Sequence, residues 1–407
     1  MKTIVPKVLL FLVAFSSLLG QWERFSSPLG KLSLHEIGML VFSFFIITTT
    51  SSFTVSKILK NRGVLAIFTW FSWLGFVTIL QSKMSDNPIL LSIGFAYLSR
   101  MVLYFIFGLM LLAYLQKTKS NLKKVSLFVF GWLVFQLLLG IGQYLFFPDT
   151  RLLSYLGWDD HLNRAMGTLL DPGFFGLLMS FGSLLSFEQY LLHHTQKNKH
   201  WWSLAFAGFV FGVALSFSRS SYLAFIVGFL IYAFLRRQRS ILLAIPLLIL
   251  SLVLIPKDGG GEGQKLLRSN SVEARIEVTE IHAQAFQGID WLIGKGWYYE
   301  GALQVHRQAL GKGSQSLPVS HAQAVDNSYL HVLFSAGLPG LAWFGGMLIA
   351  LIWKLRYHPV NEALLGAVLT HSLFSTALFY PWVWLTVGTL FVAFFVGEQP
   401  RSQDKEK

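Results

Sequence analysis

The chain has 407 residues, of which 54% are hydrophobic and only 13% are charged, and its mean hydropathy is +0.55. A soluble domain carries about 25% charged residues, so this composition excludes an ordinary soluble protein and indicates that lipid surrounds much of the chain. The net charge is +13, and the absence of cysteine excludes disulfide frameworks, iron–sulfur clusters and thiol catalysis.

Apolar runs long enough to cross a bilayer recur along the whole chain. A spanning helix needs about 20 predominantly apolar residues, and charged or Pro/Gly-rich breaks end such runs. Twelve runs result, at residues 4–20, 36–55, 64–81, 88–115, 125–147, 169–192, 201–217, 221–235, 240–255, 327–353, 362–379 and 380–397. The sequence predicts an all-α fold, a polytopic membrane bundle of about 12 transmembrane helices, with residues 1–407 forming a single integral membrane domain.

The distribution of Lys and Arg between the loops predicts the orientation, because basic loops tend to stay in the cytoplasm. With the N-terminus inside, the cytoplasmic segments hold 19 Lys and Arg residues, whereas the short outer loops hold six. Twelve spans with both termini in the cytoplasm satisfy this bias. The positive excess then belongs to the cytoplasmic side, so it is no sign of a nucleic-acid partner.

The longest polar stretch, residues 256–326 between the ninth and tenth helices, falls on the outer side. Chemistry with water-soluble groups is expected there, and this loop is the expected catalytic region. Asn270 and Glu273 form a capping-box pattern before a run with helical spacing. The apolar positions of that run are Val272, Ile276, Thr279, Ala283 and Phe286. They predict an amphipathic helix on the outer membrane face.

Three arginines are assigned to the same outer side, whereas the chain has no GxxxxGK[ST], GxSxG or HExxH motif. Arg164 precedes the sixth helix, Arg219 lies between the seventh and eighth, and Arg275 projects from the amphipathic helix. A guanidinium group donates to two phosphate oxygens at once and keeps its charge. The alternative for each arginine is a lipid-headgroup or loop-capping contact.

Two other sets of polar residues leave alternatives open. Arg100 lies inside the fourth apolar run, where it needs either a structural ion-pair partner or a substrate contact. Asp159 and Asp160 are either solvated or ligands of a divalent ion. His371 fits a hydrogen-bonded packing residue better than a catalyst.

The most specific pattern is Val-Asp-Asn-Ser-Tyr-Leu at 325–330, followed by Ala-Gly-Leu-Pro-Gly at 336–340. Supporting patterns are Arg-x-x-Gly-Thr with Asp-Pro within 164–172, Ser-x-Ser-Arg-Ser at 216–220, and Arg275 followed by Gly-Lys-Gly-Trp at 294–297. In this order, and with the long outer loop, residues 160–345 resemble the O-antigen ligase and O-antigen polymerase superfamily of bacterial membrane glycosyltransferases.

One position distinguishes the branches of this superfamily. Ligases that attach O-antigen to the lipid A core carry His immediately before the motif Asn, and this chain has Asp326 before Asn327. Polymerases and exopolysaccharide enzymes often have Asp-Asn, so the resemblance favours a polymerase. The chain departs from some polymerases in lacking a clear Arg-x10-Gly pattern.

The resemblance implies a multi-pass protein of the bacterial inner (cytoplasmic) membrane, in contact with membrane lipids and with its active site on the outer face. It implies transfer from a polyprenyl-diphosphate glycan donor to a hydroxyl of a glycan or lipid-linked glycan acceptor. The transfer is expected to invert the anomeric centre and to need neither a metal nor another cofactor.

Roles for individual residues follow from charge and from these matches. Arg219, Arg275 and Arg164 are expected to neutralise the departing diphosphate. Asp326 is the expected base for the acceptor hydroxyl, with His321 in reserve. The predicted catalytic residues are Asp326, His321, Arg275 and Arg219, and the predicted substrate-binding residues are Arg164, Asn327 and Arg100.

Three alternatives remain: a true ligase, a 12-helix secondary transporter, and a scaffold without chemistry. A transporter usually places its polar residues at the bilayer midplane and often has internal repeats. Only Arg100 and His371 fit such a placement, and no repeat is visible in the sequence.

Overall fold

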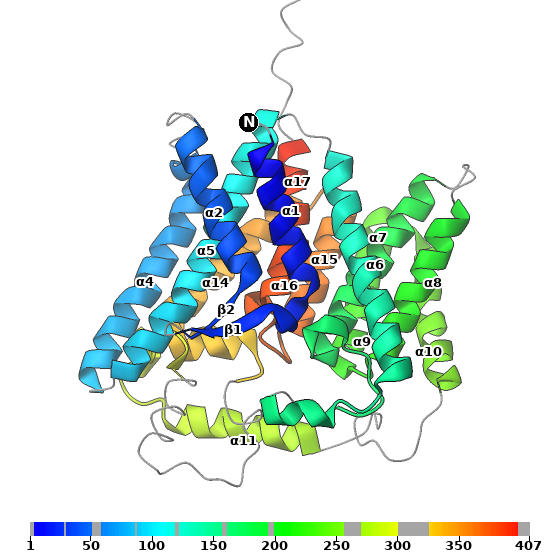
Figure 1. Ribbon diagram of the computed structural model, residues 1–407. Coiled ribbons are helices and arrows are strands. Elements are labelled where there is room, and N and C mark those ends of the chain that lie inside the picture. The colour runs from blue at the N-terminus through cyan, green and yellow to red at the C-terminus, as the bar shows by residue number, and fades with distance from the viewer. Residues whose placement is uncertain are drawn as a thin grey trace, which may run out of the picture.

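Helices that run up and down in one bundle form most of this protein (Figure 1). The computed structural model describes residues 4–27, 30–50, 58–85, 88–118, 122–156, 161–193, 199–255, 270–299 and 325–397. Within these residues, each of the twelve predicted apolar runs contains a helix. Helices suit a lipid environment because their backbone N–H and C=O groups are satisfied within each segment.

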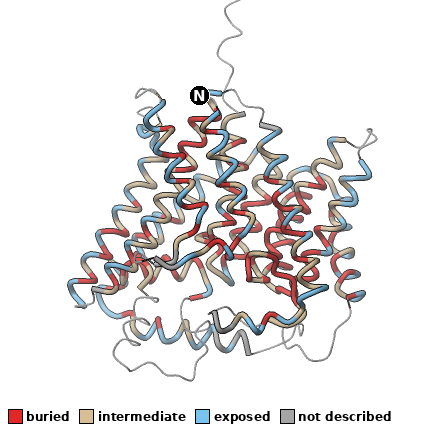
Figure 2. The backbone as a smooth tube through the Cα atoms, in the orientation of Figure 1, coloured by how far each residue is buried: buried red, intermediate tan, exposed pale blue. Residues whose placement is uncertain are grey.

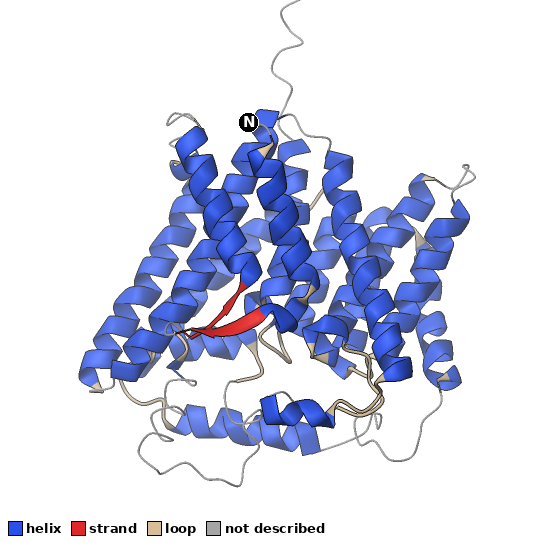
Figure 3. Cartoon of the chain, viewed as in Figure 1, coloured by secondary structure: helices blue, strands red, loops and turns tan. Residues whose placement is uncertain are grey.

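The first part of the chain forms five long helices. A β-hairpin connects the first two of them, toward one end of the bundle (Figure 3). The elements are α1 (Val5–Leu18), a 3-10 turn (Gly20–Glu23), β1 (Arg24–Ser27), β2 (Gly30–Ser33), α2 (Leu34–Thr49), α4 (Arg62–Met84), α5 (Pro88–Thr118) and α6 (Leu122–Phe146). The strands pair antiparallel, with Arg24 opposite Ser33. The predicted all-α class is confirmed, because helices form the bundle, and the two-stranded hairpin between α1 and α2 is a local feature that no pattern in the sequence indicated.

The second part of the chain adds the helices that surround the site. They are α7 (Pro172–Leu192), α8 (Lys199–Leu215), α9 (Arg219–Arg236), α10 (Ala244–Leu254), α11 (Asn270–Gln284), α12 (Asp290–Ile293), α14 (Ser328–Leu355), α15 (Pro359–His371), α16 (Pro381–Val383) and α17 (Thr389–Gly397). Short 3-10 turns lie at Arg151–Leu156, Gly167–Leu169, Arg239–Leu243 and Ala377–Phe379, and a π-helical turn at Trp384–Gly388 joins α16 to α17.

The predicted helix over 362–379 is too long, because α15 ends at His371. Beyond it, the carbonyl groups of Ser372 and Ser375 accept hydrogen bonds from the backbone N–H of Ser328, at 2.9 and 3.1 Å. A continuing helix would use those carbonyls itself, so the break exchanges helical hydrogen bonds for contacts with the start of α14.

Among the residues that the structure describes, six helices are long and apolar enough to cross a membrane: Arg62–Met84, Ile89–Thr118, Lys124–Phe146, Pro172–Leu192, Arg219–Arg236 and Ser328–Leu355. Shorter apolar helices accompany them at Val5–Leu18, Leu34–Thr49, Arg239–Leu254 and Pro381–Val396. The chain starts, and α17 lies, at the same end of the bundle (Figure 1). This arrangement fits a polytopic membrane protein.

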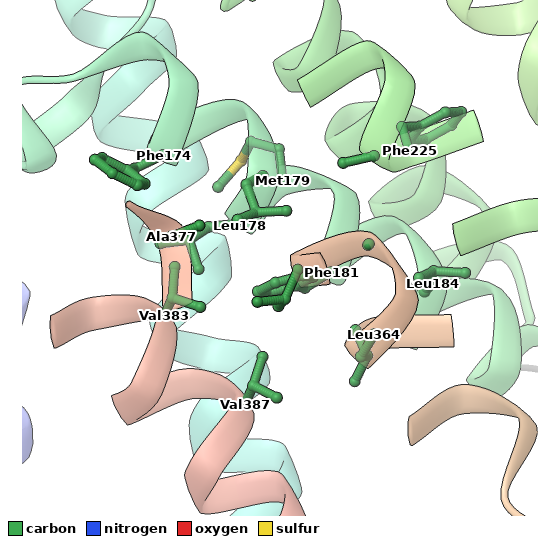
Figure 4. Close-up of a cluster of buried hydrophobic side chains, with 14 of the residues drawn as sticks. Phe174, Leu178, Met179, Phe181, Leu184, Phe225, Leu364, Ala377, Val383 and Val387 are labelled. Carbon is green, nitrogen blue, oxygen red and sulfur yellow. The ribbon is translucent and has the colours of Figure 1, made fainter. Parts of the chain in front are cut away.

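The most deeply buried part of the bundle surrounds α7, where the backbone is mostly buried in Figure 2. Figure 4 shows Phe181 and Leu184 of α7 gathered with Phe225 of α9, Leu364 of α15 and Val383 of α16. All five side chains are almost fully shielded from solvent. This packing fixes the ends of α7, α9 and α15 relative to one another, and the polar residues described next lie at those ends.

The helix predicted in this stretch is confirmed as α11, whereas its placement on the outer membrane face stays a prediction. α11 lies crosswise below the ends of the other helices in the view of Figure 1. Ile276 and Ala283 are exposed, whereas His282 and, just beyond the helix, Phe286 are buried. Phe286 packs against Val325 and Phe334, so an aromatic contact with the start of α14, rather than the aliphatic stripe, orients α11. The predicted cap residue Asn270 begins the helix, but its side chain lies outside the described part.

Candidate functional site

The β-hairpin, the first turns of α7, α9 and α14, and the whole of α11 lie at one end of the bundle (Figure 1). Arg219 is the first residue of α9, Arg275 belongs to α11, and Asn327 is the N-cap of α14. Four sequence patterns that are far apart in the chain therefore meet at this end.

Asn327 anchors the start of α14 with both ends of its side-chain amide. Its Oδ1 accepts hydrogen bonds from the N–H groups of Tyr329 and Leu330, at 2.9 and 3.0 Å, and its Nδ2 donates to the carbonyl of Leu373 at 3.0 Å. The neighbouring Ser328 hydroxyl donates to the carbonyl of Ser375 at 2.9 Å. These bonds hold the residues before α14 against the turn that follows α15, so the amide has a structural role, and substrate binding by Asn327 stays a prediction.

His371 joins three helices through a buried polar network. Its Nε2 lies 3.1 Å from the Ser220 hydroxyl and 3.1 Å from the Gly173 carbonyl, and its Nδ1 lies 2.7 Å from the Ser375 hydroxyl. The Ser221 hydroxyl donates to the same Gly173 carbonyl at 2.7 Å. Only 1% of His371 is exposed, in agreement with a hydrogen-bonded packing residue. No local pattern links His371 to Ser220, because the two residues are 151 positions apart in the chain.

Arg164 supports the turn that leads into α9. Its Nε donates to the carbonyl of Ser216 at 3.0 Å, and its Nη2 donates to the carbonyl of Phe217 at 3.2 Å. Phe217 has a positive φ of 46°, which is uncommon for a non-glycine residue and needs such support. Because Arg164 is 8% exposed and donates to these two carbonyls, its position fits the loop-capping alternative.

Arg275 and Asp326 form an ion pair between α11 and the residue before the α14 cap. The Arg275 Nε lies 2.8 Å from the Asp326 Oδ2, and the two side chains are 44% and 48% exposed. The positive charge of Arg275 lies close enough to act on His371, whose ring contacts Ser220 beside Arg219. The Arg275–Asp326 pair is therefore accessible, and it lies at the end of the bundle where α9 begins with the partly exposed Arg219. His321, the predicted reserve base, and the pair Asp159 and Asp160 lie outside the described residues.

Arg100 has a protein partner of its own. Its Nε lies 3.0 Å from the Glu36 Oε1, and its Nη2 donates to the Glu36 Oε2 at 3.2 Å. Glu36 also accepts from the N–H of Ser33 at 2.9 Å and thereby caps α2. The structure thus shows the ion-pair alternative for Arg100. The bidentate pair connects α5 to the first turn of α2, directly after the hairpin.

We expect Arg100→Gln to lower the free energy of unfolding by about 3–5 kcal/mol, because Glu36 would remain charged, 5% exposed and unpaired. The double variant Glu36→Gln with Arg100→Gln should recover much of this loss, since no charge is then buried alone. Thermal unfolding in detergent tests both variants. Equal losses in the single and double variants would show that the pair contributes no coupling.

The Gly337-Leu-Pro-Gly340 pattern breaks α14 and accepts another segment in the break. Gly337 has a φ of +69°, and Pro339 lacks the N–H that the Ser335 carbonyl would otherwise accept. That carbonyl instead accepts the N–H of Gly296 at 3.1 Å, and the N–H of Lys295 donates to the Phe334 carbonyl at 2.7 Å. The two glycine patterns recognised separately in the sequence therefore form one joint.

Two tryptophans of α4 complete this joint, and the glycines allow its close contacts. The Nε1 groups of Trp73 and Trp70 donate to the carbonyls of Ala336 and Gly340, at 3.0 and 3.2 Å. A Cβ added at Gly337 would lie 2.6 Å from the Leu292 carbonyl oxygen. The joint holds the residues that follow α11 against α14, so it sets where Arg275 lies relative to Asp326.

Gly337→Ala should therefore destabilise the protein by about 1–3 kcal/mol through backbone strain, and the clash with Leu292 should displace α11 and reduce activity as well. Gly345→Ala in the same helix is the matched control, because a Cβ there meets nothing within 4 Å. Melting temperature and product yield are the readouts. An unchanged melting temperature for Gly337→Ala would contradict this assignment.

Apolar helices form the bundle, and arginine, aspartate and serine side chains lie at one of its ends. This arrangement is that of a polytopic membrane protein with a polar site at one end of the bundle. Residues 204–345 match the family described as O-antigen ligase, so the chain contains an O-antigen ligase family domain. Enzymes of this family are membrane glycosyltransferases that transfer lipid-linked glycans in the synthesis of bacterial envelope polysaccharides. No curated protein matches the sequence.

The matched range runs from α8 into α14, so it includes both the start of α9 and the Arg275–Asp326 pair. Arg219, Arg275, Asp326 and Asn327 lie inside it. Arg164 and Arg100 lie outside it, and both are engaged by other parts of the protein.

Proposed function

We propose that this protein transfers a glycan from a polyprenyl-diphosphate carrier to an acceptor hydroxyl at the outer face of the bacterial cytoplasmic membrane. The observation that carries this proposal is the ion pair of Arg275 with Asp326, within the matched range and at the end of the bundle where α9 begins with Arg219. Two cations suit a diphosphate, and an adjacent carboxylate suits a hydroxyl that must lose its proton.

In the proposed step, the acceptor oxygen attacks the anomeric carbon while the bond from that carbon to the diphosphate oxygen breaks. The electron pair leaves with the diphosphate, and Arg219 and Arg275 stabilise the added negative charge. Asp326 takes the hydroxyl proton. Attack opposite the leaving group inverts the anomeric centre, and no step requires a metal ion.

The ion pair between Arg275 and Asp326 gives this mechanism a simple order. In the free protein the guanidinium neutralises the carboxylate. A bound diphosphate competes for the guanidinium with more negative charge, so it would draw Arg275 away from Asp326 and toward the phosphate oxygens. Substrate binding would thus prepare the base.

For the whole chain we infer twelve membrane crossings with both termini in the cytoplasm. The alternating directions of consecutive helices in Figure 1 support this inference, as does the excess of Lys and Arg on the side assigned to the cytoplasm. The candidate site then belongs to the outer face, where lipid-linked glycans are accessible.

Within the superfamily we propose a polymerase-like activity, in which the acceptor is another glycan, because Asp326 occupies the position of the ligase histidine. Purified protein in lipid nanodiscs, supplied with a polyprenyl-diphosphate glycan, tests the proposal. Lengthened lipid-linked glycan is the expected product. Transfer to an added lipid A core would identify a ligase, and no transfer to either acceptor by folded protein would contradict glycosyl transfer.

A further inference from the structure

Two polar side chains beside the hairpin have groups that no described residue satisfies. Gln21 is 6% exposed, and its Nε2 donates to the Tyr380 hydroxyl at 3.1 Å, but its Oε1 is buried without a hydrogen-bond partner. The Nε of Arg24 is also buried without a partner. Among the described residues, none forms a hydrogen bond or ion pair with the Arg24 guanidinium. A buried amide oxygen and a buried guanidinium N–H left in this state are costly, although the Arg24 side chain as a whole is partly exposed.

The acids near Arg24 are already paired with other residues. Glu23 contacts the His35 ring, and Glu36 holds Arg100 in the bidentate pair. Arg24 itself lies over an aromatic ring, with its Cζ 5.4 Å from the centre of Trp382. An indole ring orients a guanidinium but does not neutralise it. The guanidinium is thus held in place while its charge remains uncompensated by the described side chains.

Tyr380 connects this pair to the candidate site. Its hydroxyl donates to the carbonyl of Leu169 at 3.3 Å, and its ring stacks on Phe174, with centroids 3.5 Å apart. On its other side, Phe174 lies 5.9 Å from the His371 ring. The hairpin lies at the same end of the bundle as α11 and the start of α14 (Figure 3). Gln21 and Arg24 therefore flank the site from outside the matched range.

We propose that Gln21 and Arg24 form a second anion subsite, which binds the carrier diphosphate of a lipid-linked acceptor. Arg24, whose side chain is partly exposed, donates to a phosphate oxygen, and Gln21 positions Tyr380 beside it through their hydrogen bond. This inference rests on the proposed function, in which Arg219 and Arg275 bind the donor diphosphate. Elongation of one lipid-linked glycan by another brings a second diphosphate to the same end of the protein. Arg24 is the cation that would bind this second diphosphate.

The surroundings of the hairpin suit a lipid-linked ligand. Trp22, between the two residues in the chain, and Phe25, which follows Arg24, are 58% and 40% exposed. Aromatic side chains at a membrane–water interface contact acyl or isoprenoid chains with their rings while polar neighbours face the headgroups. A diphosphate with an isoprenoid tail matches this combination of exposed rings and the Arg24 guanidinium, which no described residue engages in a hydrogen bond or ion pair.

The test compares a lipid-linked acceptor with the same glycan lacking its carrier, in transfer by the full-length protein. The wild type should have a KM for the lipid-linked acceptor about 10- to 100-fold lower. Arg24→Gln should abolish this preference, with little change in kcat, and Arg24→Lys should restore part of it. Gln21→Met should also raise the KM for the lipid-linked acceptor. Wild-type preference retained in Arg24→Gln would overturn the proposal.

The control variant is Arg151→Gln. Arg151 is exposed and paired with Asp149, where its side-chain hydrogen bonds lower the pKa of Asp149 to about 2. This variant should keep the wild-type acceptor preference. Arg24→Gln should melt no lower than the wild type, because it removes a charge without orphaning a partner. A lower melting temperature would indicate that Arg24 serves the fold instead.

Binding without turnover separates this inference from the proposed function. Native mass spectrometry with polyprenyl diphosphate alone, without a glycan, should show two bound molecules for the wild type and one for Arg24→Gln. That result would stand even if the wild type transferred no glycan. Displacement of the second molecule by an equal concentration of phosphatidylglycerol would identify a general phospholipid site and overturn the proposal.

Discussion

Replacing Arg275 by alanine is expected to lower kcat for glycan transfer by about 10²–10³-fold, because a preorganised cation at the departing diphosphate is lost. The ion pair with Asp326 is about half exposed, and such pairs contribute only about 0–1 kcal/mol to stability. Insertion into the membrane and the melting temperature should therefore remain close to those of the wild type. The readouts are the transfer rate of purified protein and the length of polysaccharide made by cells.

Two further variants locate this effect at the charge. Arg275→Lys should recover part of the activity, since it keeps a cation but loses the bidentate geometry. Arg219→Ala should fall in the same direction as Arg275→Ala, whereas Arg151→Ala should not. Wild-type product lengths in both Arg219→Ala and Arg275→Ala would contradict the assigned roles.

Asp326→Asn should reduce kcat by about 10²–10⁴-fold, because the amide cannot accept the proton of the acceptor hydroxyl. Asparagine has nearly the same shape, so the start of α14, which Asn327 and Ser328 anchor, should fold unchanged. The same variant leaves Arg275 without its carboxylate partner, so donor binding should be unchanged or tighter. The measurement is a steady-state comparison of kcat and of KM for the donor.

His321→Ala is the counterpart of that experiment. Full activity in Asp326→Asn, together with an inactive His321→Ala, would exchange the two roles. A loss confined to Asp326→Asn would support the aspartate as base.

Much of the fold follows directly from sequence, because each apolar run needs only local helical hydrogen bonds to form its span. The exceptions depend on contacts far apart in the chain. α15 ends at His371, rather than at 379, because Ser328 takes the carbonyls of Ser372 and Ser375. Phe286, just beyond α11, is buried because Phe334 offers it an aromatic contact, whereas Ile276 within α11 is exposed.

The candidate site was predictable in its position but not in the division of work among its residues. The order of the motifs indicated that Arg164, Arg219, Arg275 and Asn327 belong together. It could not show that Arg164 is occupied by the carbonyls of Ser216 and Phe217, since that depends on the backbone path of a turn. Two other features have no local pattern in the sequence: the pairing of Arg100 with a glutamate 64 positions away, and the isolation of Arg24.

The central claim is that the bond between glycan and carrier breaks at the outer end of this bundle, with Arg275 assisting. Its most direct test is release of free polyprenyl diphosphate from proteoliposomes in which the glycan-bearing lipid is accessible only from the side of α11. We predict release by the wild type, matched by an equal amount of newly linked glycan, and little release by Arg275→Ala. Movement of the intact lipid-linked glycan across the bilayer without release, or equal release by both proteins, would contradict the account.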